Sequence, residues 1–254
     1  MVEMDITHFD ELEYQAAEAV NTLCANLSFV GSEYRKIMVT SCHPQEGKSF
    51  VTMNLMRSLA RLGHRVILID ADIRASALQA VYGINVVSAS NKKYHGLVGY
   101  LVGRSSIDDI VGKTSIPGAY MILAGRTVTN SLPLFNKPRF EHLIETLSQA
   151  FDIILIDTPP VGTIIDAAKI AQSSDGILFV VQSGGTSSTE MQAAIHQIEK
   201  TGCPIMGYVL NKSPERAESK YYYSSGYRPA NRGKPYVREK TAARRKHHKR
   251  PPKG

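Results

Sequence analysis

The feature that most constrains the fold is an alternation of short, wholly apolar runs with segments of helical periodicity. The apolar runs lie at residues 66–69, 153–156, 176–181 and 205–210. A strand that is apolar on both faces must be buried on both, which is typical of a parallel sheet with helices on each side. The sequence therefore predicts an α/β fold, in which a mostly parallel sheet is covered by helices on both faces.

Helical patterns fill the intervals between these runs. Residues 10–27 have helical periodicity, and a further apolar run at 36–40 predicts a strand before the next helix. In residues 48–62 the apolar side chains recur on one helix face, at Val51, Leu55, Leu59 and Leu62. Gly63 is placed to end that helix because glycine readily adopts the left-handed conformation that closes a helix.

The chain is expected to have three parts, a helical N-terminal segment (1–30), one α/β domain (31–212) and a tail (213–254). Within the domain, residues 187–200 form another helical pattern that begins with serines and is followed by a glycine and a proline. Residues 83–118 are less regular, and we expect them to form a surface excursion with short helices.

The tail differs in composition from the rest of the chain. Its few aliphatic side chains and its abundance of Pro, Gly, Ser and charge predict disorder. Of the 30 Lys and Arg residues, 11 lie in residues 228–254, so the rest of the chain has 19 basic and 22 acidic residues and is mildly acidic. The basic end could contact an anionic membrane surface, bind nucleic acid nonspecifically or stay solvated; we favour membrane contact over nucleic acid.

The tail also holds a cluster of tyrosines. Five of the chain's 12 tyrosines lie there, at Tyr221, Tyr222, Tyr223, Tyr227 and Tyr236. They have almost no aliphatic neighbours, so they are hard to explain as core residues. Composition alone favours a linker or a docking segment for a partner.

The sequence has no feature of a membrane-spanning or exported chain. No apolar run approaches the roughly 18 residues that a spanning helix needs. The N-terminus is acidic and lacks the basic and apolar regions of a signal peptide, so we expect a cytoplasmic protein. The three cysteines, Cys24, Cys42 and Cys203, are widely spaced, and we expect neither a disulfide framework nor a zinc site.

The strongest local signal is a strand-to-helix loop at residues 41–49, which reads SCHPQEGKS. A bound phosphate needs backbone N–H groups at a helix N-terminus, a mobile ammonium and a hydroxyl for Mg²⁺. Gly47, Lys48 and Ser49 provide these groups in the right order, although Cys42 stands where the strict motif has its first glycine. We therefore expect a nucleotide to contact this loop, at Pro44, Gln45, Glu46, Gly47, Lys48, Ser49 and Phe50.

Two of the apolar runs lead directly into aspartates. ILIDADIR contains Asp70 and Asp72, and ILIDTPP contains Asp157. Residues two apart in an extended segment point the same way, so Asp70 and Asp72 should face one site. Ligands bind at the carboxyl ends of strands in open parallel sheets, and Mg²⁺ prefers oxygen ligands. Each aspartate alone could form a turn or cap a helix, but together with the loop they predict a Mg²⁺-nucleotide site.

With these motifs the chain resembles the deviant-Walker group of P-loop ATPases and, within it, the bacterial tyrosine kinases of capsular and extracellular polysaccharide synthesis. The resemblance covers most of residues 15–212 and includes IPGAYMILAG, ILIDTPPVGTIIDAA and SSDGILFVVQSGGTS. The tail resembles that family's tyrosine cluster. Partitioning ATPases of the same group have an additional lysine where this chain has His43, which favours the kinase interpretation.

The resemblance implies a P-loop NTPase fold and tyrosine autophosphorylation between subunits, with ATP and Mg²⁺ as cofactors. It implies that Lys48 holds the β and γ phosphates and that Ser49, Asp72 and Asp157 hold the metal and its water shell. We choose Asp70 as the base that accepts the tyrosine proton, with Asp72 assisting, although spacing leaves this choice open. Asn211 and Lys212, which follow the last strand, are predicted to contact adenine, with a simple turn as the alternative. The tail tyrosines are then the phosphoacceptors.

The resemblance also implies a partner and an assembly. Family members of this kind are activated by a separate transmembrane chain-length regulator at the inner face of the cell membrane. The family's Glu-x-x-Arg-x-x-Arg pattern, which builds a ring of subunits, is here EAVNTLC at residues 18–24, without either arginine. Self-association is expected, whereas a ring held by those charge pairs is in doubt. The alternative function is a P-loop ATPase or nucleotide switch that docks on a membrane or nucleic-acid partner without phosphorylating tyrosine.

Overall fold

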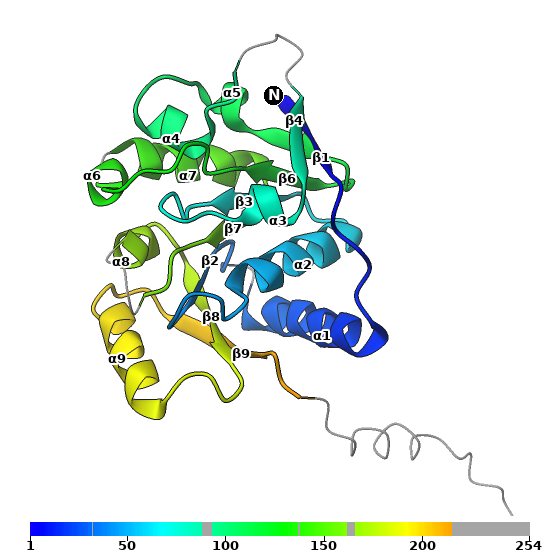
Figure 1. Ribbon diagram of the computed structural model, residues 1–254, viewed down its shortest axis with the longest axis vertical. Helices are drawn as coiled ribbons and strands as arrows, with labels where there is room; N and C mark the ends of the chain where they lie inside the picture. Colours follow the sequence, from blue (N-terminus) through cyan, green and yellow to red (C-terminus); the bar gives the residue numbers. More distant parts are fainter. Residues whose placement is uncertain (32, 88–92, 137, 162–165, 215–254) are drawn as a thin grey trace, which may run out of the picture. The chain divides into compact units, whose positions relative to one another are not determined.

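The structure is a computed structural model that describes residues 1–31, 33–87, 93–136, 138–161 and 166–214. The chain splits into two units, Met1–Pro214 and Glu215–Gly254, and all the described residues belong to the first. Within that unit a single sheet has the strand order β4-β1-β5-β6-β3-β7-β2-β8-β9 (Figure 1).

The central and C-terminal strands of this sheet are parallel to one another. They are β6 (Ala119–Ile122), β3 (Val66–Asp70), β7 (Ile153–Asp157), β2 (Lys36–Ser41), β8 (Gly176–Gln182) and β9 (Ile205–Asn211). All five residues of β3 are buried, as expected for a strand that has helices on both faces. The predicted α/β fold is confirmed, and the predicted strands lie within one residue of those observed.

The other end of the sheet has a feature that the sequence interpretation missed. β5 (Gly112–Thr114) pairs antiparallel with β6, β1 (Val2–Ile6) pairs parallel with β5, and β4 (Ile84–Val87) pairs antiparallel with β1. Residues 2–6 are therefore a strand, not part of a helical segment. Likewise, part of the stretch expected as a surface excursion joins the sheet. Its predicted short helices are present as α4 (Gly96–Leu101) and α5 (Ile107–Ile110).

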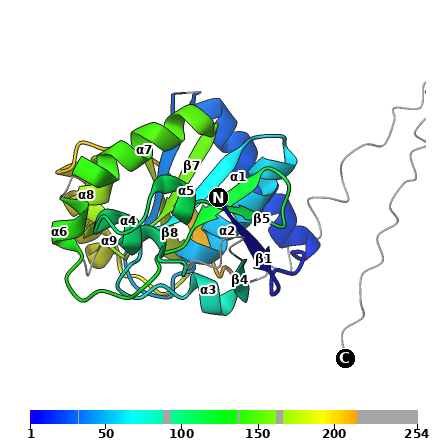
Figure 2. The ribbon, with the colours of Figure 1, turned by 90° about the horizontal axis from the view of Figure 1, so that it is seen from above.

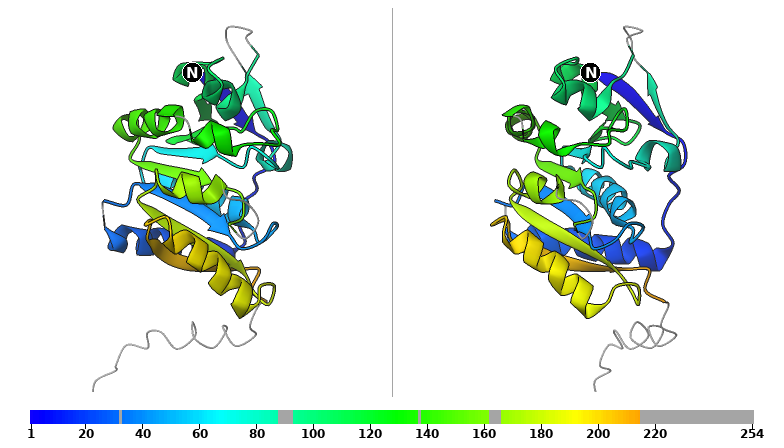
Figure 3. Two further views of the ribbon diagram at one scale, coloured as in Figure 1. Left: turned by 90° about the vertical axis from the view of Figure 1, so that its left-hand side faces the viewer. Right: turned by 60° about the vertical axis from the view of Figure 1, so that its left-hand side comes forward.

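Helices cover both faces of the sheet (Figures 2 and 3). One face is covered by α1 (Tyr14–Val30), α2 (Lys48–Arg61) and α3 (Leu78–Val81), and its core includes Leu68 and Leu155. The other face is covered by α4, α5, α6 (Leu132–Phe135), α7 (Pro138–Ala150), α8 (Asp166–Ala171) and α9 (Ser188–Glu199). Ile67 and Ile69 point into this second core, so alternate residues of β3 hold the two helical layers to the sheet.

The helix ends agree with their local sequence. Gly63 has φ +93° just beyond α2, and its N–H donates to the Ala60 carbonyl. Ser187 caps α9 in a capping box with Glu190. In the described part of the chain, no helix is long and apolar enough to cross a membrane.

Candidate active site

The loop between β2 and α2 has the backbone of a phosphate-binding loop. Gln45 and Gly47 have φ values of +64° and +95°, and Gly47 is the N-cap residue of α2. Because glycine has no side chain, no side-chain hydrogen bond caps the helix there. The first N–H groups of α2 are therefore available to an anion, and the partial positive charge of the helix N-terminus favours one.

Glu46 holds the loop in this shape from inside. Its side chain is buried, with 3% of its surface exposed. The carboxylate accepts hydrogen bonds from the His43 N–H at 2.8 Å, the Gln182 N–H at 3.4 Å and the Thr186 hydroxyl. The Glu46 side chain is thus occupied in joining the loop to the end of β8, which leaves its backbone as the part that can face a nucleotide.

The end of β9 is tied to the same loop. The Asn211 side-chain amide donates to the Glu46 carbonyl at 2.9 Å. The Lys212 ammonium donates to the Gln45 carbonyl at 2.6 Å and to Gln182 Oε1 at 3.2 Å. The structure thus gives Asn211 a part in positioning the loop, while its predicted contact with adenine stays a prediction. Lys212 was predicted together with Asn211 as an adenine contact, and not as a support of the loop.

Four predicted residues meet at the start of α2. Lys48 Nζ lies 3.5 Å from Asp72 Oδ2, and both side chains are almost buried. The Ser49 hydroxyl lies near Asp157 and lowers the pKa of its carboxylate. The phosphate-loop cation and hydroxyl therefore each lie against a carboxylate that follows a central strand.

Asp70 lies beside this group at the end of β3. It is in register with Asp157 on the neighbouring strand β7. Its carboxylate accepts a hydrogen bond from the Ser76 hydroxyl, and the Ala124 N–H also acts on it, lowering its pKa. All three carboxylates, Asp70, Asp72 and Asp157, influence one another electrostatically, so they belong to one site.

Burial sets the proton affinity of this site. It raises the pKa of Asp70 to about 8, with the neighbouring Asp157 adding to the shift. Burial also raises the pKa of Asp157 to about 6, although Lys48 and Ser49 act in the opposite direction. A buried pair of carboxylates disfavours two negative charges, so the site has a reason to take up a cation or a proton.

The residues fit a magnesium ion. Asp70 Oδ1 and Asp157 Oδ1 are buried and have no hydrogen-bond partner within the described residues. In that same part of the chain, no group of three or more His, Cys, Asp or Glu side chains is arranged to hold a metal. An ion held here would therefore depend on Ser49, water and phosphate oxygens besides a carboxylate, which is the mixed coordination that Mg²⁺ accepts.

The remaining predicted residues have different positions. Pro44 lies in the turn of the loop, and Phe50 is on α2 with 42% of its surface exposed. The predicted phosphoacceptors lie outside the described residues; they are Tyr221, Tyr222, Tyr223, Tyr227 and Tyr236.

A supporting network next to the site was not recognised from sequence. Buried Asp166 at the start of α8 accepts a hydrogen bond from Arg74 Nε at 2.9 Å and another from the Ser131 hydroxyl. Arg74 Nε also lies 2.6 Å from Ser131 Oγ. This network fixes the segment that follows Asp72. The arginine after the two aspartates was the available signal, but its buried partner lies 92 positions away.

Comparison with known proteins gives consistent matches. A family model described as an AAA domain matches residues 34–203. The tyrosine-protein kinase CpsD of Streptococcus pneumoniae serotype 4 is 36% identical over 198 residues, which are 78% of this chain and 85% of that protein.

Solved structures match as well. The kinase domain of the Escherichia coli tyrosine kinase Etk matches with a TM-score of 0.72 and 29% identity, over 84% of this chain and 80% of that one. The septum site-determining protein MinD of Pyrococcus horikoshii, solved with Mg-ADP, matches with a TM-score of 0.57 and 26% identity, over 73% of this chain and 75% of that one.

Proposed function

The chain belongs to the bacterial tyrosine-protein kinases, and we propose that it transfers the γ-phosphoryl group of Mg-ATP to tail tyrosines of a neighbouring copy. It is a P-loop protein-tyrosine kinase, and the relatives favour this activity over a nucleotide switch without kinase activity. The observation that carries the proposal is the convergence of Lys48, Ser49, Asp72 and Asp157 at an uncapped helix N-terminus, with Asp70 beside them.

Each residue has a role that follows from its position. The N–H groups at the start of α2 and the Lys48 ammonium would bind the outer phosphates, and Asp72 would hold that ammonium in place. Mg²⁺, held by Ser49 and by Asp157 through water, would neutralise charge that develops on the phosphates. Phosphoryl transfer depends mainly on such positioning and charge stabilisation.

Asp70 is the proposed base. A general base works best when its pKa lies near the working pH, and burial raises the pKa of Asp70 to about 8. The Ser76 hydroxyl and the Ala124 N–H orient its carboxylate. Asp70 would accept the tyrosine proton while the phenolic oxygen attacks the phosphorus atom.

The biological setting is also part of the proposal. We place the kinase at the inner face of the cell membrane, where a transmembrane chain-length regulator of polysaccharide synthesis activates it and the basic tail contacts anionic lipid. The polysaccharide role comes from the family resemblance, which the match to the pneumococcal kinase CpsD supports.

Intact-mass and peptide mass spectrometry would test the proposal. The full chain is incubated with Mg-ATP and the cytoplasmic segment of a candidate activator, beside Lys48→Met. We expect phosphate on the tail tyrosines of the wild type alone. Phe substitution of the five tail tyrosines should abolish the signal, whereas Tyr14→Phe, at a tyrosine that is 73% exposed on α1, should not. Bound ATP and a docked activator without tail phosphorylation would instead indicate a nucleotide switch.

A further inference from the structure

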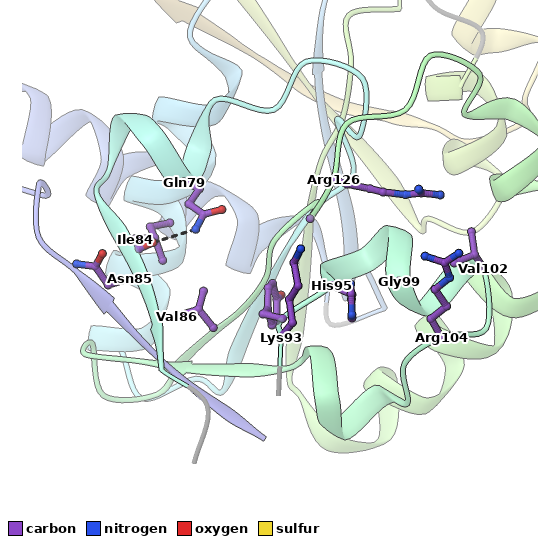
Figure 4. A pocket seen from close by; sticks show the side chains of 12 residues that line it. Gln79, Ile84, Asn85, Val86, Lys93, His95, Gly99, Val102, Arg104 and Arg126 are labelled. Atoms are coloured by element: carbon purple, nitrogen blue, oxygen red, sulfur yellow. Dashed lines mark hydrogen bonds between the residues drawn. The ribbon is translucent and has the colours of Figure 1, made fainter. Parts of the chain in front are cut away.

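A basic cavity lies next to the candidate active site and has no part in the chemistry described above. Its volume is about 560 Å³, and it is formed by the segment from α3 to β4, by residues 93–104 and by the loop after β6 (Figure 4). Four basic side chains line it: Lys93, His95, Arg104 and Arg126. Lys93, His95 and Arg104 lie in one segment and Arg126 lies in the loop after β6, and the fold brings the two segments together.

The charge of the cavity is one-sided. Among the described residues that line it there is no Asp or Glu. Lys93, Arg104 and Arg126 are exposed, and within the described residues their side chains make no ion pair or hydrogen bond. Asp5 is opposite Asn85 in the register of β1 and β4, but does not line the cavity. Several unpaired cations around one hollow favour an anion with more than one charge.

The cavity is built onto the residue that orients the proposed base. Gly125 and Arg126 directly follow Ala124, whose N–H acts on the Asp70 carboxylate and lowers its pKa. The Ala124 carbonyl in turn accepts the Val98 N–H at 3.1 Å, which joins the loop to α4. Two residues of chain span at most about 7 Å, so the cavity wall begins close to the Asp70 carboxylate.

The contact between the loop and α4 is tight. A Cβ atom added at Gly125 would lie 2.1 Å from the His95 carbonyl oxygen, and one added at Gly96 would lie 2.6 Å from the Gly125 nitrogen. The backbone that carries the cations is therefore held in place before any ligand arrives. Because this backbone is already fixed, only the side chains have to be ordered when an anion binds.

We propose that this cavity binds a phosphotyrosine that the tail has already acquired, and thereby holds the same tail for the next transfer. This inference rests on the proposed tail phosphorylation. A phosphotyrosine carries about −1.5 to −2 charges and three acceptor oxygens, which suits clustered Arg and Lys side chains. Tyr221, Tyr222 and Tyr223 are consecutive in the sequence. At about 3.3 to 3.6 Å per residue, one tyrosine can therefore lie at Asp70 as the acceptor while a phosphorylated neighbour is within reach of the cavity.

A binding experiment separates this proposal from catalysis. Dephosphorylated full-length chain without nucleotide is titrated with a labelled peptide of residues 215–230, either unmodified or phosphorylated at Tyr222. We expect the phosphopeptide to bind at least ten-fold more tightly. The double variant Arg104→Gln/Arg126→Gln should lose that preference, while Lys200→Gln, an exposed cation beyond α9, should keep it. An equal affinity for both peptides, or an undiminished preference in the double variant, would overturn the proposal.

Two further arms define the ligand. Inorganic phosphate should compete only at concentrations far above the Kd of the phosphopeptide; equal potency would reassign the cavity to free phosphate. With Mg-ATP and activator, the wild type should accumulate chains with several phosphates, whereas the double variant should accumulate chains with one at an unchanged initial rate. The peptide titration needs no kinase activity, so its outcome does not depend on whether the tail is the substrate.

Discussion

Gly47 offers a test of how the phosphate loop is built. It has φ +95°, and a Cβ atom added there would lie 1.9 Å from the Asn211 side-chain nitrogen. Gly47→Ala should therefore have two costs. The left-handed backbone costs about 1–2 kcal/mol for a residue with a Cβ atom. Displacing Asn211 breaks its hydrogen bond to Glu46, which costs about 0.5–1.5 kcal/mol more.

Gly63 is the matched control because it isolates the first cost. It follows the other end of α2 with φ +93°, and a Cβ atom there would meet nothing within 4 Å. Gly63→Ala should therefore lower the stability by the backbone cost alone. We expect urea denaturation to show Gly47→Ala to be less stable than Gly63→Ala by about 1 kcal/mol, the size of the lost hydrogen bond.

A double-mutant cycle would then identify the steric partner. In an Asn211→Ala background the amide is absent, so Gly47→Ala should cost no more than Gly63→Ala does. The coupling between positions 47 and 211 should therefore be about 1 kcal/mol. Strictly additive losses would refute the reasoning, since they would mean that Asn211 does not lie over Gly47 in solution.

Three other substitutions test the site and its surroundings. Asp70 has a pKa of about 8 in the folded chain but an ordinary low pKa in the unfolded chain, so the nucleotide-free chain becomes less stable as pH rises. Asp70→Asn should therefore raise Tm more at pH 8 than at pH 5, and an equal shift would contradict this. Asp166→Ala leaves Arg74 without its buried partner and should lower the free energy of unfolding by about 3 kcal/mol, the low end for such pairs because Arg74 is partly exposed. A loss below about 1 kcal/mol in urea denaturation would argue against the network. Ser187→Ala removes the cap of α9 and should cost about 1 kcal/mol in the same assay, whereas Ser188→Ala, inside the helix, should cost less; equal losses would exclude a capping role.

The central strands could be predicted because burial on both faces leaves a continuous apolar run in the sequence. β1 has no such run, since it is half-exposed, with Val2 and Met4 buried and Glu3 exposed. β5 has only three residues, too few for any periodicity. Both strands depend on partners far away in the sequence, so their local sequence does not identify them.

The candidate site could be predicted in its motifs but not in its supports. Lys48, Ser49 and the aspartates follow from residue types at strand and helix ends. Lys212 and Ala124 act on the site through a side chain or a backbone N–H whose position only the sheet order determines. A backbone N–H has no sequence signature, which is why the tie between Ala124 and Asp70 could not be anticipated.

The strand order has a consequence for synthesis. β2 leads into the phosphate loop, yet its neighbours in the sheet are β7 and β8, which the ribosome makes much later. At about 5–20 residues per second, roughly 6–23 s pass between the emergence of β2 and that of Asp157. During this interval the strand has neither of its sheet partners and the loop has no carboxylate from β7. A nascent chain therefore carries an apolar, aggregation-prone strand before it can bind nucleotide, and chaperones have that interval in which to protect it.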